Sequence, residues 1–181
     1  RAAGVRAAKR RFLGKTTTYR VAARRCLSVD TPADLEVAEV LLRRLQRQRL
    51  GQLLPNPVAA VVFDFDGVFT DNRVLVSETG EEAVWCSRGD GWGVVALRRL
   101  GIPALVLSAE VNPVVQARCR KLDIPCIQGE RDKWPVLQQW LESQGIARES
   151  VVFVGNDEND VECLERVGCG VAVGDAQPSA R

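Results

Sequence analysis

The chain has 181 residues, of which 46% are hydrophobic and 27% are charged, and its formal net charge is +2. This length can bury the core of one globular domain with some sequence to spare, while no apolar stretch approaches the roughly 18 to 20 residues that cross a bilayer. Histidine is absent, which excludes Ser-His-Asp and Cys-His catalysis and histidine-ligated metal sites.

The first 29 residues form a basic segment. They contain nine Lys or Arg side chains and no acidic one, so subtracting nine from the net charge of +2 leaves −7 for the remaining residues. Such a segment is compatible with a nucleic-acid-binding arm or a transit peptide. Because it begins without an initiator methionine and shows no regular interleaving of aromatic and basic residues, we instead interpret residues 1–50 as the C-terminal remnant of a preceding domain. We expect neither nucleic acid nor a membrane as a partner.

A helix is predicted next. In LEVAEVLLRRLQRQRL, apolar residues recur at helical spacing over residues 35–50. Thr31 or Asp30 is the expected N-terminal cap and Gly51 the expected end. Two prolines follow shortly afterwards, so we place a linker and a domain boundary at residues 51–57.

From residue 58 onward, strand-like and helix-like segments alternate. We expect strands at residues 58–65, 104–108, 125–128, 150–155 and 170–173, helices at 89–100, 112–122, 133–144 and 157–167, and a β-hairpin over 68–86 that turns at Thr79-Gly80. Short apolar strands that alternate with helices indicate a parallel sheet covered on both faces. For residues 58–181 we therefore predict an α/β fold, a three-layer Rossmann-like sheet with a β-hairpin flap.

Polar side chains follow the ends of these strands, where α/β folds place their ligand crevice. These residues are Asp64 and Asp66 after the first strand, Ser108 after the second, Lys133 at the start of a helix, and Asn156, Asp157 and Asp160 after the fourth strand. Because the carboxyl ends of parallel strands lie at one edge of a sheet, we expect these groups to converge on one site.

These side chains suit phosphoryl transfer. A carboxylate such as Asp64 can attack phosphorus and carry the phosphoryl group as an acyl phosphate. Asp66 lies two residues further, so it points the same way and can act first as general acid and then as general base. Ser108 and Lys133 can bind the phosphoryl oxygens.

Magnesium is the expected cofactor. Mg²⁺ prefers oxygen ligands and binds few protein carboxylates at a time. The predicted ligands are Asp64, Asp66 through its backbone, Asn156 and Asp157. The ion would offset the repulsion between the attacking carboxylate and the phosphate.

The motifs that carry these residues resemble those of the haloacid dehalogenase (HAD) phosphatases. FDFDGVFTD resembles the first motif of that family, LVLS the second, GERDKW the third and VGNDEND the fourth, in the family's order over residues 58–175. The resemblance implies an HAD-like fold and Mg²⁺-dependent hydrolysis through an aspartyl-phosphate on Asp64. The fourth motif of the family usually begins Gly-Asp, whereas Asn156 stands here, so we expect weaker metal binding.

The segment after the first motif resembles the capless branch that includes 3-deoxy-D-manno-octulosonate 8-phosphate phosphatase. A single hairpin stands where other members have a cap domain, and SRGDGWGVVALRRLGI follows it. The resemblance implies a homotetramer in which the hairpins meet and a neighbour's C-terminal tail closes the site, and the chain ends at Arg181, before such a tail. Gly67, Thr70, Arg88 and Asp160 are candidates for supporting or substrate-binding roles.

The stretch LSVDTPADLEVAEVLL resembles the C-terminal end of the acylneuraminate cytidylyltransferases, which often carry a capless HAD domain downstream. Ser28 stands where that family has the first of two acidic residues, and Asp30 matches the second. The leading hypothesis is a cytoplasmic, Mg²⁺-dependent phosphatase domain fused to a cytidylyltransferase that would use its product. Its substrate would be a sugar-acid phosphate of the acylneuraminate 9-phosphate or 3-deoxy-octulosonate 8-phosphate type.

Two other hypotheses stay open. The domain could be a catalytically weak module that assembles a CMP-sialic acid synthetase into tetramers through its hairpin, which Asn156 and the absent tail favour. A phosphoacceptor receiver domain also uses acids, a hydroxyl and a lysine, but its acceptor aspartate follows a later strand and it lacks a D-x-D pair. The six cysteines include no C-x-x-C pair, so we expect them to be thiols in a reducing cytosol.

Overall fold

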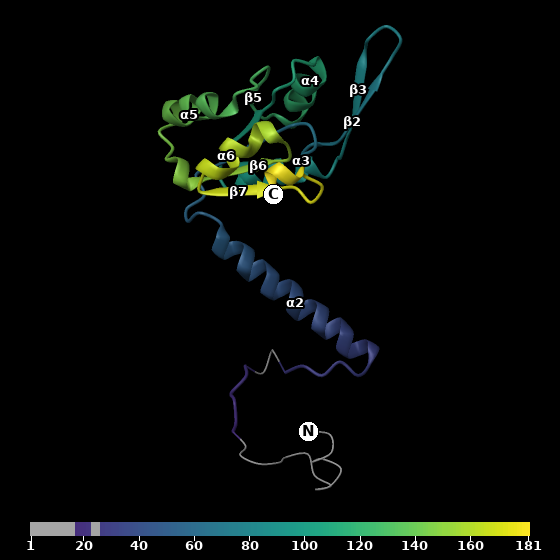
Figure 1. Cartoon of the computed structure of the whole chain (residues 1–181), viewed down its shortest axis with the longest axis vertical. Coiled ribbons are helices and arrows are strands. Elements are labelled where there is room, and N and C mark those ends of the chain that lie inside the picture. The colour runs from purple at the N-terminus through teal and green to yellow at the C-terminus, as the bar shows by residue number, and fades with distance from the viewer. Residues whose placement is uncertain (1–16, 23–25) are drawn as a thin grey trace. The chain divides into compact units, whose positions relative to one another are not determined.

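The computed structural model of the chain describes residues 17–22 and 26–181 (Figure 1). Contacts between Cα atoms divide the chain into two units, residues 1–49 and 50–181. Most of the basic segment that we assign to a preceding domain lies outside the described residues. Among the helices that the structure describes, none combines the length and the apolarity that a membrane span requires.

Helix α2 (Pro32–Leu53) begins where the sequence predicts. Thr31 and Asp34 cap each other, because the Thr31 N–H donates to the Asp34 carboxylate at 2.9 Å and the Asp34 N–H donates to the Thr31 hydroxyl at 3.2 Å. The predicted end at Gly51 is wrong, because this glycine does not adopt the positive φ of a C-terminal cap and the helix passes through it. The first three residues of the expected linker 51–57 therefore belong to the helix.

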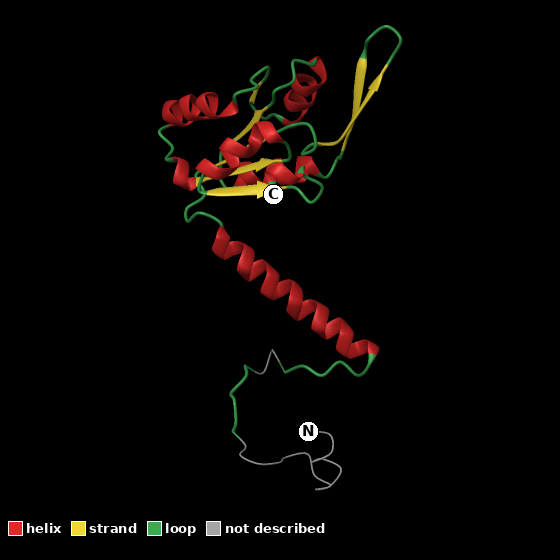
Figure 2. Cartoon of the chain, in the orientation of Figure 1, coloured by secondary structure: helices red, strands yellow, loops and turns green. Residues whose placement is uncertain are grey.

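The second unit is built on a five-stranded sheet in the order β5-β4-β1-β6-β7, with every neighbouring pair parallel. The strands are β1 (Ala60–Phe63), β4 (Ala104–Leu107), β5 (Cys126–Ile127), β6 (Val151–Gly155) and β7 (Cys169–Ala172), drawn as yellow arrows in Figure 2. This arrangement confirms the predicted α/β fold. The carboxyl ends of β4, β1 and β6 therefore lie side by side at one edge of the sheet.

Helices cover both faces of this sheet. They are α3 (Asp90–Arg99), α4 (Pro113–Leu122), α5 (Lys133–Gln144) and α6 (Val161–Arg166), together with the short 3-10 turns η2 (Arg148–Ser150), η3 (Glu158–Asp160) and η4 (Pro178–Ala180). The single helix predicted over residues 157–167 is divided into η3 and α6.

Two hydrophobic cores lie on the two sides of the sheet, because successive strand side chains point to opposite faces. Val62 and Leu105 belong to the core that contains Leu137 of α5. Val106, the next residue of β4, belongs instead to the core that contains Val115 of α4. The domain thus has the three layers that the sequence predicts.

The hairpin predicted over residues 68–86 is also present. Strand β2 (Thr70–Val76) pairs antiparallel with β3 (Glu82–Cys86), and the turn contains Gly80 at a φ of +81°. The pairing shifts register between Thr70 and Val74, where Asn72 adopts a φ of +60°. Figure 1 shows the two strands leaving the sheet domain together, as a separate two-stranded ribbon.

Candidate active site

Asp64 lies directly after β1, at the centre of the sheet. Its backbone N–H donates to the Val154 carbonyl of β6 at 2.8 Å, which extends the β1–β6 pairing to this residue. The side chain is buried, and its Oδ1 accepts a hydrogen bond of 2.7 Å from Lys133 Nζ. Burial raises the pKa of the Asp64 carboxyl to about 6, the Lys133 charge opposes that rise, and the Asp160 charge adds to it.

Lys133, the first residue of α5, joins two acidic residues that come from different parts of the chain. Its Nζ donates to Asp64 and, at 2.6 Å, to Asp160 Oδ1. The side chains of Lys133 and Asp160 are both fully buried. A buried ammonium group is tolerated only when it is paired and hydrogen-bonded. We refer to Asp64, Lys133 and Asp160 as the buried triad.

Asp160 also shapes the loop that follows β6. Its second oxygen, Oδ2, accepts hydrogen bonds from the N–H groups of Asn156 at 2.8 Å and Asp157 at 3.1 Å. Asp157 in turn caps the short turn η3, where its carboxylate accepts from the Glu158 N–H at 2.7 Å. Residues 157–160 therefore form a tight turn before α6 begins, which is why the predicted helix is divided.

Asp66 is half-buried, beside the backbone turn that leads into β2. Burial is the main cause that raises the pKa of its carboxyl, the charge of Glu110 adds to the rise, and a hydrogen bond with Thr70 opposes it. The Thr70 hydroxyl also accepts the Gly67 N–H at 3.0 Å. Gly67 has a φ of +81°, and an added Cβ would lie 2.0 Å from Asn156 Nδ2, so both the turn and the close contact require glycine.

Ser108 follows β4 and is 1% exposed. Its hydroxyl oxygen accepts the Glu110 N–H at 3.1 Å, and its backbone N–H donates to the Ile127 carbonyl of β5. The hydroxyl hydrogen stays available for a further acceptor, such as a phosphoryl oxygen.

Two predicted residues lie at the surface. The Asp157 side chain is exposed and engaged in its own turn. Arg88 is exposed, and within the described part of the chain it makes no hydrogen bond and no ion pair. The structure therefore does not bring Arg88 into contact with the buried triad.

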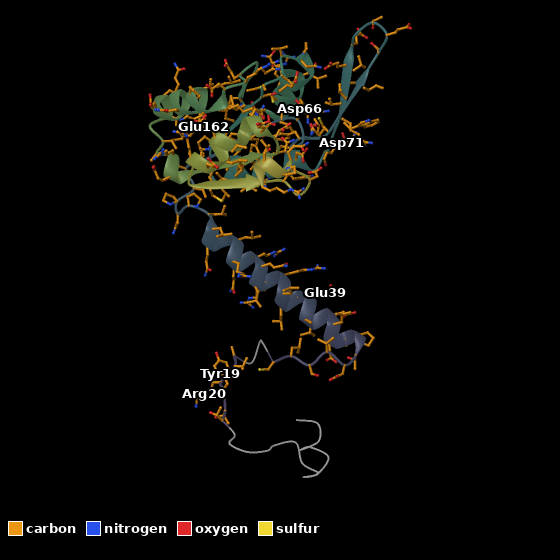
Figure 3. All side chains as sticks on the ribbon, in the orientation of Figure 1. Tyr19, Arg20, Glu39, Asp66, Asp71 and Glu162 are labelled. Carbon is orange, nitrogen blue, oxygen red and sulfur yellow. The ribbon has the colours of Figure 1, made fainter. Side chains whose placement is uncertain are left out.

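A cavity of about 200 Å³ adjoins Asp66, between the hairpin and α4. Apart from Asp66, the sequence patterns did not predict a place in the site for its polar lining residues, which are Asn72, Arg73, Glu82, Glu110 and Asn112. Glu110 and Asn112 directly follow the Ser108 strand end, so the crevice rule could have included them. The hairpin residues carried no such signal, because only folding brings them next to Asp66. Figure 3 shows Asp66 and Asp71 on the side where the hairpin leaves the domain, well apart from Glu162.

The side chain of Asn156 offers an oxygen ligand at the expected magnesium site. Asn156 is 4% exposed, and its Oδ1 is buried with no hydrogen-bond partner among the described residues. A buried carbonyl oxygen without a hydrogen-bond partner can serve as a ligand for a hard cation such as Mg²⁺. No group of three or more His, Cys, Asp or Glu side chains within the described ranges has the arrangement of a metal site. The oxygen ligands that fit a cation here are the Asp64 carboxylate, the Asn156 amide oxygen and backbone oxygen near Asp66.

The sequence is similar to those of known hydrolases. Residues 122–181 match the family model of the haloacid dehalogenase-like hydrolases. The chain is 32% identical over 122 residues to the 3-deoxy-D-manno-octulosonate 8-phosphate phosphatase KdsC of Escherichia coli K12, an alignment that covers 67% of this chain and 65% of that relative. The chain therefore spans slightly less than two thirds of the length of this curated relative.

Solved structures agree with this similarity. A protein from Streptomyces avermitilis that is assigned to the HAD family of hydrolases is 52% identical, with a TM-score of 0.68, over 71% of this chain and 80% of that one. The Moraxella catarrhalis 3-deoxy-D-manno-octulosonate 8-phosphate phosphatase, solved with magnesium, phosphate and KDO, is 26% identical, with a TM-score of 0.66. That match covers 68% of this chain and 72% of the relative.

Proposed function

The chain belongs to the haloacid dehalogenase (HAD) family of hydrolases, and from this membership we propose that residues 58–181 hydrolyse a phosphomonoester with Asp64 as the nucleophile. The observation that carries the proposal is the buried triad at the end of β1. Lys133 holds Asp64 Oδ1, and Oδ2 is the oxygen that would attack phosphorus. Half-buried Asp66 stands two residues away, beside a cavity that can admit a substrate.

Two displacements complete the proposed reaction. In the first, Asp64 attacks phosphorus, the P–O bond to the sugar breaks, and Asp66 gives its proton to the leaving alkoxide. In the second, Asp66 takes a proton from water, and that water attacks the aspartyl-phosphate to release phosphate and free Asp64. A raised pKa favours the protonated form that Asp66 needs for the first displacement. Ser108 and Lys133 would bind the phosphoryl oxygens.

A divalent cation would reduce the repulsion between Asp64 and the phosphate when it is bound. Asp64, the backbone of Asp66 and Asn156 would hold it directly, and Asp157, whose carboxylate caps its own turn, directly follows Asn156 in the chain. Support comes from the unpartnered oxygen of Asn156 and from the magnesium in the M. catarrhalis relative.

The proposed substrate is the phosphate ester of a sugar acid. Relatives named for 3-deoxy-D-manno-octulosonate 8-phosphate support an eight-carbon acid. The resemblance of residues 27–42 to acylneuraminate cytidylyltransferases instead favours a nine-carbon acylneuraminate 9-phosphate. We propose that this segment belongs to such a cytidylyltransferase in a longer parent protein, and the coding sequence upstream checks this directly.

Phosphate release with Mg²⁺ from both sugar-acid phosphates tests the proposed function. We expect Asp64→Asn to lower kcat by at least about 10³-fold, because the nucleophile is lost, and Asp66→Asn to lower it by about 10²- to 10⁴-fold, because the general acid is lost. Asp123→Asn is the matched control, since Asp123 is an exposed carboxylate whose ion pair is with Arg98. Unchanged turnover in Asp64→Asn would refute the mechanism.

A second candidate function is assembly. The neutral Asn156 and the apolar surface of the hairpin favour a catalytically weak module that brings chains together as a homotetramer. Particle mass and turnover on the same panel of sugar phosphates separate the two candidates. A tetramer that hydrolyses none of them would favour the assembly module.

A further inference from the structure

Two cysteines meet where the chain passes from α4 to β5. Cys119 lies near the end of α4, is 2% exposed and belongs to the same core as Val106. Cys126 is the first residue of β5, pairs with Val106 in the sheet and packs against that core. Between them Asp123 adopts a φ of +54°, and the Ile124 N–H donates to the Cys119 carbonyl at 3.1 Å. The chain therefore reverses within a few residues and returns Cys126 to the side of Cys119.

The two thiols are hydrogen-bonded to each other. The bond from Cys119 is the main cause that lowers the pKa of Cys126, and burial opposes it. The same bond is the main cause that raises the pKa of Cys119, and burial adds to that rise. Because the thiolate is the reactive form of cysteine, Cys126 is the nucleophile of the pair.

Access from solvent ranks the two thiols in the same order. Strand β5 is an outer strand of the five-stranded sheet, and Cys126 is partly exposed there, whereas Cys119 is buried. A reagent in solution therefore meets Cys126 first. Since the two thiols are already in contact, Cys119 can attack a sulfur bonded to Cys126 without a large movement of the backbone.

We propose that Cys126 and Cys119 form a reversible disulfide site, whose oxidant is a low-molecular-weight disulfide of the glutathione type. In the first step the Cys126 sulfur attacks one sulfur of the oxidant, the S–S bond of the oxidant breaks, and one small thiol leaves with the proton that Cys126 has released. In the second step the Cys119 sulfur attacks the Cys126 sulfur, and the second small thiol leaves with the proton of Cys119.

These two steps balance. One small disulfide is reduced to two thiols, while the two cysteines are oxidised and lose two hydrogen atoms. A reducing dithiol reverses the exchange. The chemistry uses neither the buried triad nor the proposed hydrolysis.

Cys86 is the competing partner for Cys119. It ends β3, packs against the same core, and its charge contributes to the raised pKa of Cys119. The hydrogen bond of Cys119, however, is with Cys126. The structure therefore favours the bond between Cys119 and Cys126.

Peptide mapping of the full chain tests the proposal. The reduced protein is incubated with oxidised glutathione under native conditions, quenched with acid, alkylated on its remaining thiols in denaturant, and digested with trypsin without reduction. Trypsin cleaves after Arg120 and Lys121, so Cys119 and Cys126 fall in separate peptides. We expect mass spectrometry to find these peptides joined and two hydrogen atoms lighter than their sum, and dithiothreitol to separate them.

Two results of this map would overturn the proposal. One is recovery of the two peptides unlinked, with both cysteines alkylated. The other is a peptide that joins Cys119 to Cys86. The map uses the unaltered chain, so it decides the proposal even if a variant fails to fold.

Two variants test the order of the steps. Cys119→Ser should keep glutathione on Cys126, at least about tenfold more than the unaltered chain does, because the second thiol that would displace it is gone. Cys26→Ser is the matched control, since it removes an exposed thiol from the first unit, and it should leave the yield of the internal bond unchanged. Equal glutathione on Cys126 in Cys119→Ser and the unaltered chain, or loss of the internal bond in Cys26→Ser, would contradict exchange within the pair.

Discussion

At the scale of single residues, the buried triad places three charged side chains in hydrogen-bond contact inside the domain. Lys133 lies between Asp64 and Asp160, and none of the three side chains has more than slight contact with water. Removing one member of such a group leaves uncompensated charge in a medium that solvates it poorly. The three residues therefore act together on stability as well as on any chemistry.

Replacing Lys133 by Met should destabilise the domain by about 3 to 5 kcal/mol, because Asp64 and Asp160 would lose their shared buried cation. Urea unfolding followed by circular dichroism measures the change. The control is Lys121→Met, which alters an exposed lysine of α4 and should shift stability by less than about 0.5 kcal/mol. Similar shifts in the two variants would contradict a structural role of the triad.

Asp64 should also make the stability of the metal-free domain depend on pH. Its pKa is about 6 in the folded state, against 3.8 for an unperturbed Asp, so between these values the folded protein holds a proton that the unfolded chain has released. The stabilisation is complete below about pH 4 and is lost as pH rises through 6.

Between pH 4 and pH 7, the chain should therefore lose on the order of 2 to 3 kcal/mol relative to Asp64→Asn, whose side chain does not titrate. Urea unfolding in the presence of a chelator measures both proteins across this range. Parallel pH profiles for the two proteins would show that the pKa of Asp64 is not raised.

At the scale of elements, the turn between β6 and α6 depends on close packing. An added Cβ at Gly155 would lie 2.7 Å from Cβ, Cγ and Oδ2 of Asp160. Asp160 in that position holds the backbone of Asn156 and Asp157 as well as Lys133. A small residue at the end of one strand thereby fixes the geometry of a loop and of the triad together.

Gly155→Ala should displace Asp160, destabilise the domain by about 1 to 3 kcal/mol and reduce Mg²⁺ binding, because the loop that presents Asn156 would shift. Thermal unfolding and Mg²⁺ calorimetry measure the two effects. Gly93→Ala is the matched change in α3, where an added Cβ meets nothing within 4 Å, and it should be neutral or stabilising. Full Mg²⁺ binding by Gly155→Ala would argue against this role of the turn.

At the scale of the whole molecule, the hairpin exposes more apolar surface than an isolated domain usually does. Val74, Leu75, Val76 and Trp85 are between 53% and 77% exposed, all on β2 and β3. Neighbouring exposed apolar side chains of this kind mark interaction surfaces. The homotetramer that the family resemblance implies would cover them.

Leu75→Glu should therefore convert a tetramer into smaller species, because a buried unpaired carboxylate is costly at an apolar interface. Light scattering after size-exclusion chromatography measures the mass. Leu100→Glu, at an equally exposed position at the end of α3, should leave the mass unchanged. A tetramer that survives Leu75→Glu would exclude the hairpin as its contact.

The strands and helices of the second unit were largely predictable, because hydrophobic periodicity and caps are local signals. Asn112 caps α4 through a hydrogen bond of 2.9 Å from the Val114 N–H, and Gly145 ends α5 at a φ of +64°, in agreement with the predicted ranges 112–122 and 133–144. Gly51 and the divided helix after Asp157 were missed. There the outcome depends on backbone angles and on contacts with Asp160, which a periodic pattern does not contain.

The sequence by itself determined that parallel strands end in Asp64, Asp66, Ser108 and Asn156, because polar residues after short apolar runs are visible in one dimension. Only the tertiary structure decided which of these groups form ion pairs and which are buried. Lys133 reaches Asp64 across 69 positions of the chain and also holds Asp160, while Asn156 keeps a free buried oxygen. Pairing and burial arise from packing between segments that are distant in the chain, so no local sequence pattern contains them.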